Sequence, residues 1–110
     1  MDEFEVKVTD HAFAAMEEIR DYISDILLNP SAAVSHMELF REKIKELAFA
    51  PDTIKPIDEQ PRHDMGVRKV RVKNFYIYYW VEDTKNLVHV TDVIYVGADQ
   101  PKWLKDMPLE

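Results

Sequence analysis

A chain of 110 residues fits one compact domain, and we expect residues 1–110 to form it. The absence of cysteine excludes a disulfide scaffold, a thiolate zinc site and thiol catalysis. The acidic start lacks the basic and apolar blocks of a signal peptide, and the longest apolar run is far below the ~20 residues of a membrane span, so we expect a cytoplasmic protein without membrane contact. Of the net charge of −7, residues 1–50 carry −6, so a polyanion such as nucleic acid would be repelled by the first half of the chain.

The first half of the chain predicts a strand followed by two helices. Residues 4–8 alternate between apolar and charged side chains, as in a strand with one buried side. Thr9 and Asp10 are N-cap candidates for a first amphipathic helix, which ends at the Asn29-Pro30-Ser31 turn. Ser31 is placed to cap a second amphipathic helix, which Pro51 ends. Two such helices joined by a tight turn predict a helical hairpin.

The second half predicts a loop and three strands. Residues 51–65 contain three prolines among polar residues and form the loop, and strands are expected at 67–73, 75–82 and 87–96. A short helical turn is expected around Trp103 and Leu104. The predicted fold class is α+β: an N-terminal strand at the sheet edge, a helical hairpin on one sheet face, and a three-strand antiparallel meander. The other sheet face would then be free for function.

The residues give little support for metal or cofactor chemistry. None of the four histidines stands at zinc-ligand spacing from another, so we expect no metal site. No nucleophile elbow is present, and two glycines are too few for a phosphate-binding glycine loop. We therefore expect no cofactor.

A basic cluster begins the meander. It consists of Arg68, Lys69, Arg71 and Lys73. Alternation places Lys69, Arg71 and Lys73 on one side of a strand and Arg68 on the apolar side. The cluster either protects a solvated sheet edge or binds a target, and the half-buried Arg68 needs an internal or an external partner.

Aromatic side chains crowd the central strand. Alternation places Tyr76, Tyr78 and Trp80 on one face and Phe75, Ile77 and Tyr79 on the other. On the last strand it directs Val88, Val90, Ile94 and Val96 toward the helices and His89, Thr91, Val93 and Tyr95 toward the free face. Rings left uncovered there would suit recognition of a protein partner.

The chain resembles the RelE/ParE superfamily of bacterial toxins over about residues 4–104. The resemblance rests on the order of elements, the Asn29-Pro30 turn, Leu47 followed by Pro51, the Gly66-Val67-Arg68 run, residues 74–79 and the closing residues 93–96. It implies the toxin of a type II toxin–antitoxin pair, often called a plasmid stabilisation protein, which its cognate antitoxin wraps and neutralises.

The resemblance implies two activities. ParE-like members inhibit growth by binding a protein target, DNA gyrase, and RelE-like members cut messenger RNA on the ribosome. For cleavage the candidate catalytic residues are Arg68, Tyr76 and His89, but most of the basic residues of the RelE pattern are absent, which leaves enzyme activity open. The candidate target-binding residues are Arg68, Lys69, Arg71 and Lys73. The candidate partner-binding residues are Tyr76, Tyr78, Trp80, Tyr95 and Trp103.

Two further alternatives remain open at the sequence level. One is a non-toxic member of the superfamily retained as an interaction protein. The other is a homodimer, which would cover the same apolar surface as an antitoxin.

Overall fold

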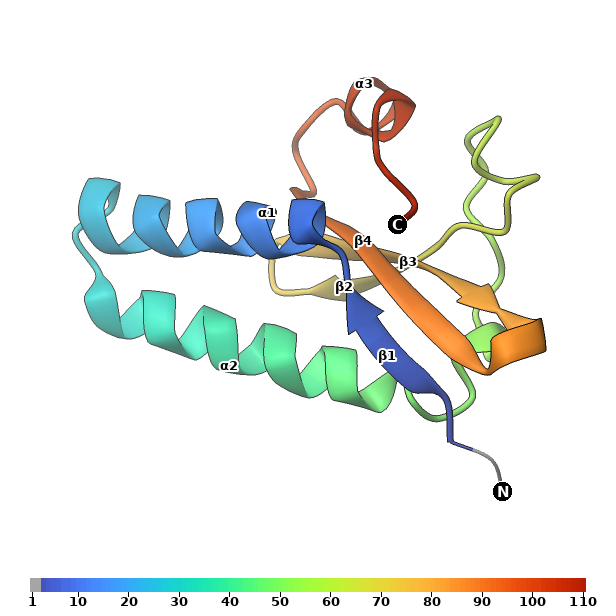
Figure 1. Ribbon diagram of the computed structural model, residues 1–110. Helices are drawn as coiled ribbons and strands as arrows, with labels where there is room; N and C mark the ends of the chain where they lie inside the picture. The colour runs from blue at the N-terminus through green and yellow to red at the C-terminus, as the bar shows by residue number, and fades with distance from the viewer. Residues whose placement is uncertain (1–2) are drawn as a thin grey trace.

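A four-stranded sheet forms the centre of the computed structural model, which describes residues 3–110 (Figure 1). The elements in chain order are β1 (Glu5–Val8), α1 (Asp10–Asp21), a π-helical segment (Tyr22–Ile26), α2 (Pro30–Glu46), a 3₁₀ turn (Pro51–Thr53), β2 (Arg68–Val72), β3 (Phe75–Glu82), a second 3₁₀ turn (Asp83–Lys85), β4 (Leu87–Tyr95) and α3 (Gln100–Lys105). The strand order is β1-β4-β3-β2, with β1 parallel to β4 and the other pairs antiparallel. The predicted α+β fold, with the first strand at the sheet edge, is confirmed.

Side-chain caps fix where the two long helices begin. The Thr9 hydroxyl accepts a hydrogen bond from the Ala12 amide at 3.0 Å and starts α1 directly after β1. The Asn29 side chain accepts from the Ala32 amide at 3.1 Å, with Pro30 in the first turn of α2. The prediction that Ser31 caps this helix is wrong, because Pro30 is compatible with the first helical turn and places the cap one residue before it.

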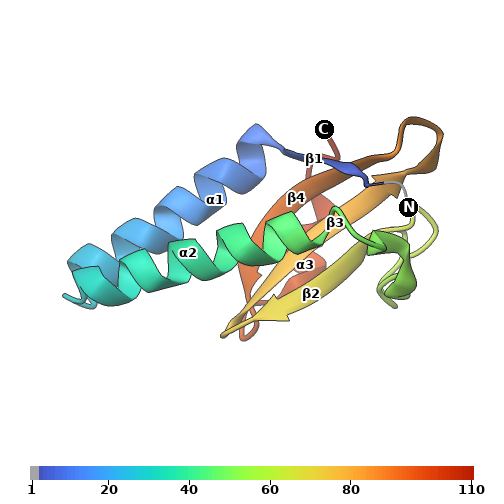
Figure 2. The same cartoon turned by 90° about the horizontal axis from the view of Figure 1, so that it is seen from below.

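The helical hairpin and α3 lie on opposite faces of the sheet (Figure 2). Side chains from α1, α2 and the near sheet face form the main core, with Phe40, Ile77 and Tyr79 at its centre. The far end of the hairpin projects beyond the sheet (Figures 1 and 2). No helix in the described part of the chain is long and apolar enough to cross a membrane.

A β-bulge in β4 breaks the alternation expected for this strand. Tyr78 pairs with Asp92 but Tyr79 pairs with Val90, so Thr91 is the extra residue. The predicted sides beyond the bulge are therefore wrong. Val93 packs in the core under the helices, whereas Ile94 packs on the α3 side.

The sheet face opposite the hairpin is covered rather than free. A second core forms there from Tyr78, Ile94, the loop residues Ile57 and Val67, and the C-terminal residues Leu104 and Met107. The buried Arg62 holds this tail in place by donating hydrogen bonds to the carbonyl oxygens of Leu104, at 2.9 Å, and Met107, at 2.6 Å. The expectation of an exposed aromatic face on β3 is corrected by this covering segment.

Candidate functional site: an apolar pocket with an acidic corner

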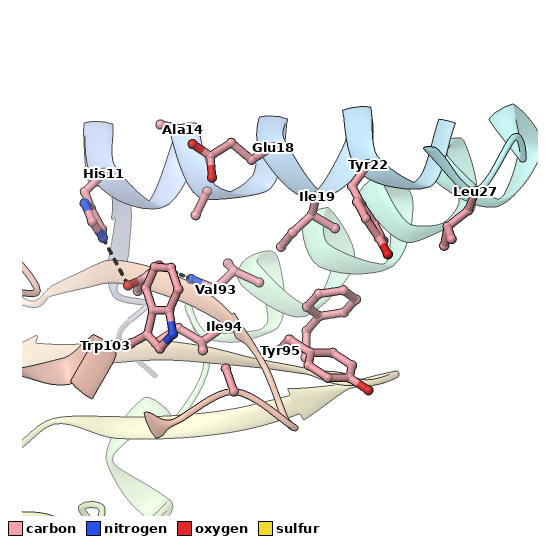
Figure 3. Close-up of a pocket in the computed structure, with 14 residues that line it drawn as sticks. His11, Ala14, Glu18, Ile19, Tyr22, Leu27, Val93, Ile94, Tyr95 and Trp103 are labelled. Atoms are coloured by element: carbon pink, nitrogen blue, oxygen red, sulfur yellow. Dashed lines mark hydrogen bonds and ion pairs between the residues drawn. The ribbon is translucent and has the colours of Figure 1, made fainter. Parts of the chain in front are cut away.

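A pocket of about 740 Å³ opens between α1, the end of β4 and α3 (Figure 3). Most of its wall is apolar or aromatic. The lining residues are His11, Ala14, Ala15, Glu18, Ile19, Tyr22, Leu27, Phe75, Asp92, Val93, Ile94, Tyr95, Ala98 and Trp103. Two of the lining aromatic residues, Tyr95 and Trp103, are 54% and 55% exposed, so their rings face solvent at the rim of the pocket.

Exposed apolar side chains continue the pocket toward the end of the hairpin. Tyr22 and Leu27 line the pocket and are themselves more than half exposed. Ile26 and Leu28, their neighbours in the sequence, are exposed by 67% and 81%. Several large exposed apolar side chains in one segment are typical of a protein interaction site.

Three polar side chains, Glu18, Asp92 and His11, also line the pocket, and we call the pair formed by His11 and Asp92 the acidic corner. The Asp92 side chain is 3% exposed, and its Oδ2 lies 3.0 Å from His11 Nε2. Its Oδ1 accepts a hydrogen bond from the Val93 amide at 2.8 Å. Burial raises the pKa of Asp92 and the nearby Glu18 carboxylate adds to this shift, while the hydrogen bond with His11 opposes it.

Local structure explains why His11 and Asp92 meet. The Thr9 cap places His11 in the first turn of α1, close to β4. On β4, the bulge at Thr91 precedes Asp92 and shifts the register there. The two residues are 81 positions apart in the sequence, so only the folded chain brings them together.

The rim at Tyr95 depends on Gly97. A Cβ atom at position 97 would lie 2.5 Å from Cε2 of the Tyr95 ring, so the ring would have to move away from its present position. The Gln100 amide then donates to the carbonyl oxygens of Tyr95, at 2.8 Å, and Ala98, at 3.0 Å. These bonds join the end of β4 to α3 and so position Trp103.

The basic cluster lies at the opposite edge of the sheet, on β2. Arg68 donates hydrogen bonds to the carbonyl oxygens of Ile54, at 2.6 Å, and Gly66, at 3.2 Å. Main-chain carbonyl groups of the same chain are therefore the partners of this half-buried guanidinium. Lys69 Nζ lies 4.2 Å from the centre of the Tyr76 ring, a cation–π contact.

The outer cations of this cluster lie near the turn after β2. Arg71 is exposed and donates to the Lys73 carbonyl at 2.9 Å. Lys73 has a positive φ of 53° and lies in the turn after β2, so the prediction that it extends the strand is wrong.

Comparisons with known proteins identify the family. Residues 6–97 match the family model described as the ParE toxin of the type II toxin–antitoxin system parDE. The chain belongs to the ParE toxin family. No curated protein sequence matches the chain significantly.

Three solved structures share the fold of this ParE-family chain. The chromosomal ParDE system of P. aeruginosa has a TM-score of 0.70 at 20% identity, over 86% of this chain and 97% of that one. The RelBE2 toxin–antitoxin complex of Mycobacterium tuberculosis has a TM-score of 0.58 at 18% identity, over 86% and 93%. An arginine-substituted E. coli toxin RelE in the free state has a TM-score of 0.57 at 19% identity, over 94% and 93%.

The candidate catalytic residues of this ParE-family chain do not form one site. Arg68 pairs with Tyr79 and lies on the hairpin side of the sheet, whereas Tyr76 and His89 lie on the α3 side. Tyr76 is four positions from Trp80, the strand partner of His89, which is roughly 13 Å along β3 at ~3.3 Å per residue. The side chains of these three residues are therefore not arranged to act together on one phosphodiester bond.

His89 has a structural environment of its own. Its Nε2 lies 2.9 Å from Glu82 Oε1, and its ring stacks on Trp80 with centroids 4.4 Å apart. The hydrogen bond from His89 is the main reason that the pKa of Glu82 lies below its usual value. Glu82, His89 and Glu110 place potential metal-ligand atoms within 4.8 Å of one another, and Lys85 Nζ lies 3.5 Å from the same Glu82 carboxylate.

The candidate partner-binding aromatics divide into two groups. Tyr78 is fully buried and its hydroxyl donates to Gln100 Oε1 at 2.7 Å, so its assignment to a partner surface is corrected. Tyr76 and Trp80 are half-buried under the tail, and the Trp80 indole donates to the Leu109 carbonyl at 2.8 Å. Tyr95 and Trp103 alone among the five line the apolar pocket.

The sequence predicts neither the acidic corner nor the hydrogen bonds from Arg62 to the C-terminal tail. His11 and Asp92 carry no short-range pattern, because each is an ordinary polar position within its own element. Arg62 offered one signal, a lone arginine in a proline-rich loop, but the carbonyl groups that accept its hydrogen bonds lie more than 40 positions later.

Proposed function

We propose that this ParE-family toxin inhibits growth by binding a protein target such as DNA gyrase, and that a cognate antitoxin neutralises it. The observation that carries the proposal is the apolar pocket beside α1, with its exposed continuation at the hairpin end. It offers a protein-binding surface, and residues 6–97 match the ParE family. The chain thus combines a toxin-family fold with a surface fit for a protein partner.

The separation of Arg68 from Tyr76 and His89 favours binding over RNA cleavage. Cleavage of a phosphodiester requires an acid, a base and cations around one phosphate. The three candidates lie on both faces of the sheet, and Arg68 is engaged by two carbonyl groups. We therefore assign the basic cluster at the β2 edge of the sheet to target binding rather than to catalysis.

The test is controlled expression of the chain in a bacterial host, with growth and transcript integrity measured together. We expect growth arrest with intact messenger RNA. A variant carrying Lys69→Gln, Arg71→Gln and Lys73→Gln should arrest growth less.

A matched control loses three cations elsewhere, through Arg41→Gln, Lys45→Gln and Lys55→Gln, and should behave like the unmodified chain. Discrete cleavage of transcripts would support the RelE-like ribosome-dependent nuclease instead. Normal growth with the folded chain present would leave only the non-toxic interaction protein.

A further inference from the structure

A histidine and two glutamates from three separate segments lie together near Trp80. Glu82 ends β3, His89 lies on β4, and Glu110 follows Leu109, whose carbonyl group accepts the hydrogen bond of the Trp80 indole. Each of the three residues offers one potential metal-ligand atom, and these atoms lie within 4.8 Å of one another. Within residues 3–110, no other three side chains of this kind are grouped so closely.

The imidazole of His89 is held in one orientation. Its side chain is 9% exposed and stacks on the Trp80 ring, with centroids 4.4 Å apart and planes 10° from parallel. Nε2 lies 2.9 Å from Glu82 Oε1, so the ring directs a nitrogen at a carboxylate. Trp80 is in turn held by its hydrogen bond to the Leu109 carbonyl at 2.8 Å. A ligand that its neighbours already orient loses less conformational freedom when it binds a metal.

Both carboxylates are accessible from solvent. The Glu82 side chain is 21% exposed, and Glu110 is exposed. The pKa of Glu82 lies below its usual value, mainly because of the hydrogen bond from His89, so this carboxylate is ionised near neutral pH. Zinc bonds of ~2.0–2.2 Å place ligand atoms ~3.3–3.6 Å apart in a tetrahedron, and the exposed side chain of Glu110 can move inward to reach this spacing.

We propose that Glu82, His89 and Glu110 bind a divalent transition-metal ion, and that Zn²⁺ suits this ligand set. Imidazole and carboxylate are both zinc ligands, and three protein ligands leave a fourth position for water. Ca²⁺ and Mg²⁺ prefer sites made of oxygen ligands, so the imidazole selects against them. Binding through Nε2 leaves the ring proton of His89 on Nδ1, and the metal takes the place of the direct hydrogen bond to Glu82. The expectation of no metal site came from the spacing between histidines, which does not apply to a site with one histidine.

Lys85 is the cation that the metal must displace. Its Nζ lies 3.5 Å from Glu82 Oε2, but its side chain is 68% exposed. An exposed ion pair of this kind contributes little to stability, so a divalent ion held by three ligands replaces it. Removal of the lysine charge should therefore strengthen metal binding. The bound ion would join the end of β3 to β4 and to the tail, independently of the proposed toxin activity.

The experiment measures Zn²⁺ binding to the full chain by isothermal titration calorimetry. The variants are His89→Gln, Glu110→Gln and Lys85→Met, and far-UV circular dichroism checks that each is folded. Glu110→Gln is the decisive ligand variant, because Glu110 is exposed, and its control is Glu38→Gln on the exposed surface of α2. The control for His89→Gln is His11→Gln. His11 also lies 3.0 Å from a carboxylate, but within residues 3–110 it belongs to no cluster of three ligands.

We expect a single Zn²⁺ site in the unmodified chain. Loss of a residue that only supports a metal ligand weakens binding by ~10–100-fold, so His89→Gln and Glu110→Gln should each weaken it by at least roughly tenfold. Lys85→Met should strengthen binding by roughly twofold to fivefold, and both controls should match the unmodified chain. Zn²⁺ should also raise the thermal unfolding midpoint of the unmodified chain more than that of Glu110→Gln.

Three results would overturn the inference. The first is the absence of Zn²⁺ binding by the folded, unmodified chain. The second is an unchanged Zn²⁺ affinity in both ligand variants, which would place the ion elsewhere. The third is equally tight binding of Ca²⁺, which would indicate attraction to an acidic surface rather than selection by an imidazole. Calorimetry requires no toxin activity, so a failure of the proposed function is distinguishable from a failure of this test.

Discussion

The substitution Arg62→Met tests how the C-terminal tail is held against the sheet. The Arg62 guanidinium is buried and donates to three main-chain carbonyls: Leu104 at 2.9 Å, Lys105 at 3.4 Å and Met107 at 2.6 Å. Methionine keeps the apolar stem but removes all three donors. The tail would then lose its polar attachment and keep only the burial of Leu104 and Met107.

The expected loss follows from two opposing effects. Hydrogen bonds from a charged donor contribute about 1.5–3 kcal/mol each, and two of the three have short distances. Against this, no carboxylate of the described chain lies within 4.0 Å of Arg62. Burial of this unpaired charge costs free energy, which offsets part of the stabilisation from the hydrogen bonds. We expect the free energy of unfolding to fall by roughly 2–4 kcal/mol, a large part of the 5–15 kcal/mol typical of domains.

Urea unfolding followed by tryptophan fluorescence measures this change. In a Trp103→Phe background the signal comes from Trp80, whose indole donates to the Leu109 carbonyl and so reports on the tail. Arg62→Met should lower the unfolding midpoint and alter the Trp80 signal before helical circular dichroism is lost. The control is Arg41→Met on the exposed surface of α2. A free energy of unfolding within about 0.5 kcal/mol of that control would refute the role of Arg62, since surface substitutions stay in this range.

Three further changes test other parts of the account. Asn29→Ala should lower stability by about 1 kcal/mol through loss of the α2 cap, and Ser31→Ala by much less; thermal unfolding showing the reverse order would contradict the capping assignment. Tyr79→Phe should cost roughly 1 kcal/mol in urea unfolding, because the buried hydroxyl, whose pKa burial raises to about 12, donates to the Pro51 carbonyl at 2.8 Å; an unchanged midpoint would remove that bond from the account. Burial raises the pKa of Asp92 above 3.8, so the folded chain binds this proton more readily than the unfolded chain, and ionised Asp92 lowers stability at neutral pH. That penalty disappears as the pH falls through the raised pKa. The free energy of unfolding of Asp92→Asn, relative to that of the unmodified chain, should therefore be higher at pH 7 than at pH 4. Urea unfolding at both pH values that gives the opposite order would contradict this prediction.

The elements could be predicted because their signals are local. Apolar residues at helical spacing, caps such as Thr9 and the proline-rich loop each determine structure within a few residues. The position of α3 around Trp103 was confirmed for the same reason, since Asp99 caps it and Pro101 lies in its first turn.

The site could not be predicted because it depends on register and on distant contacts. One extra residue, Thr91, reverses which side chains of β4 face the helices, and no sequence pattern marks this bulge. The covered sheet face depends on Arg62 meeting the tail, and the acidic corner depends on His11 meeting Asp92 across 81 positions. Alternation within a single strand contains no information of this kind.

Tyr95 is exposed, as predicted, but on a different side of the sheet from the one that alternation predicts. Simple alternation put Tyr95 on a free aromatic face of the sheet. In the structure it lies on the hairpin side, edge-on to Phe75 with ring centroids 6.0 Å apart, and lines the pocket. The absence of a side chain at Gly97 is what makes room for its ring.

Growth inhibition by binding a protein target can be tested with purified components. DNA gyrase supercoils relaxed plasmid in the presence of rising concentrations of the full chain, and the product is resolved by gel electrophoresis. We expect the chain to inhibit supercoiling, and we expect the variant lacking the cations of Lys69, Arg71 and Lys73 to inhibit less than the matched control variant. Full gyrase activity at concentrations of the chain that cleave messenger RNA on purified ribosomes would contradict this expectation.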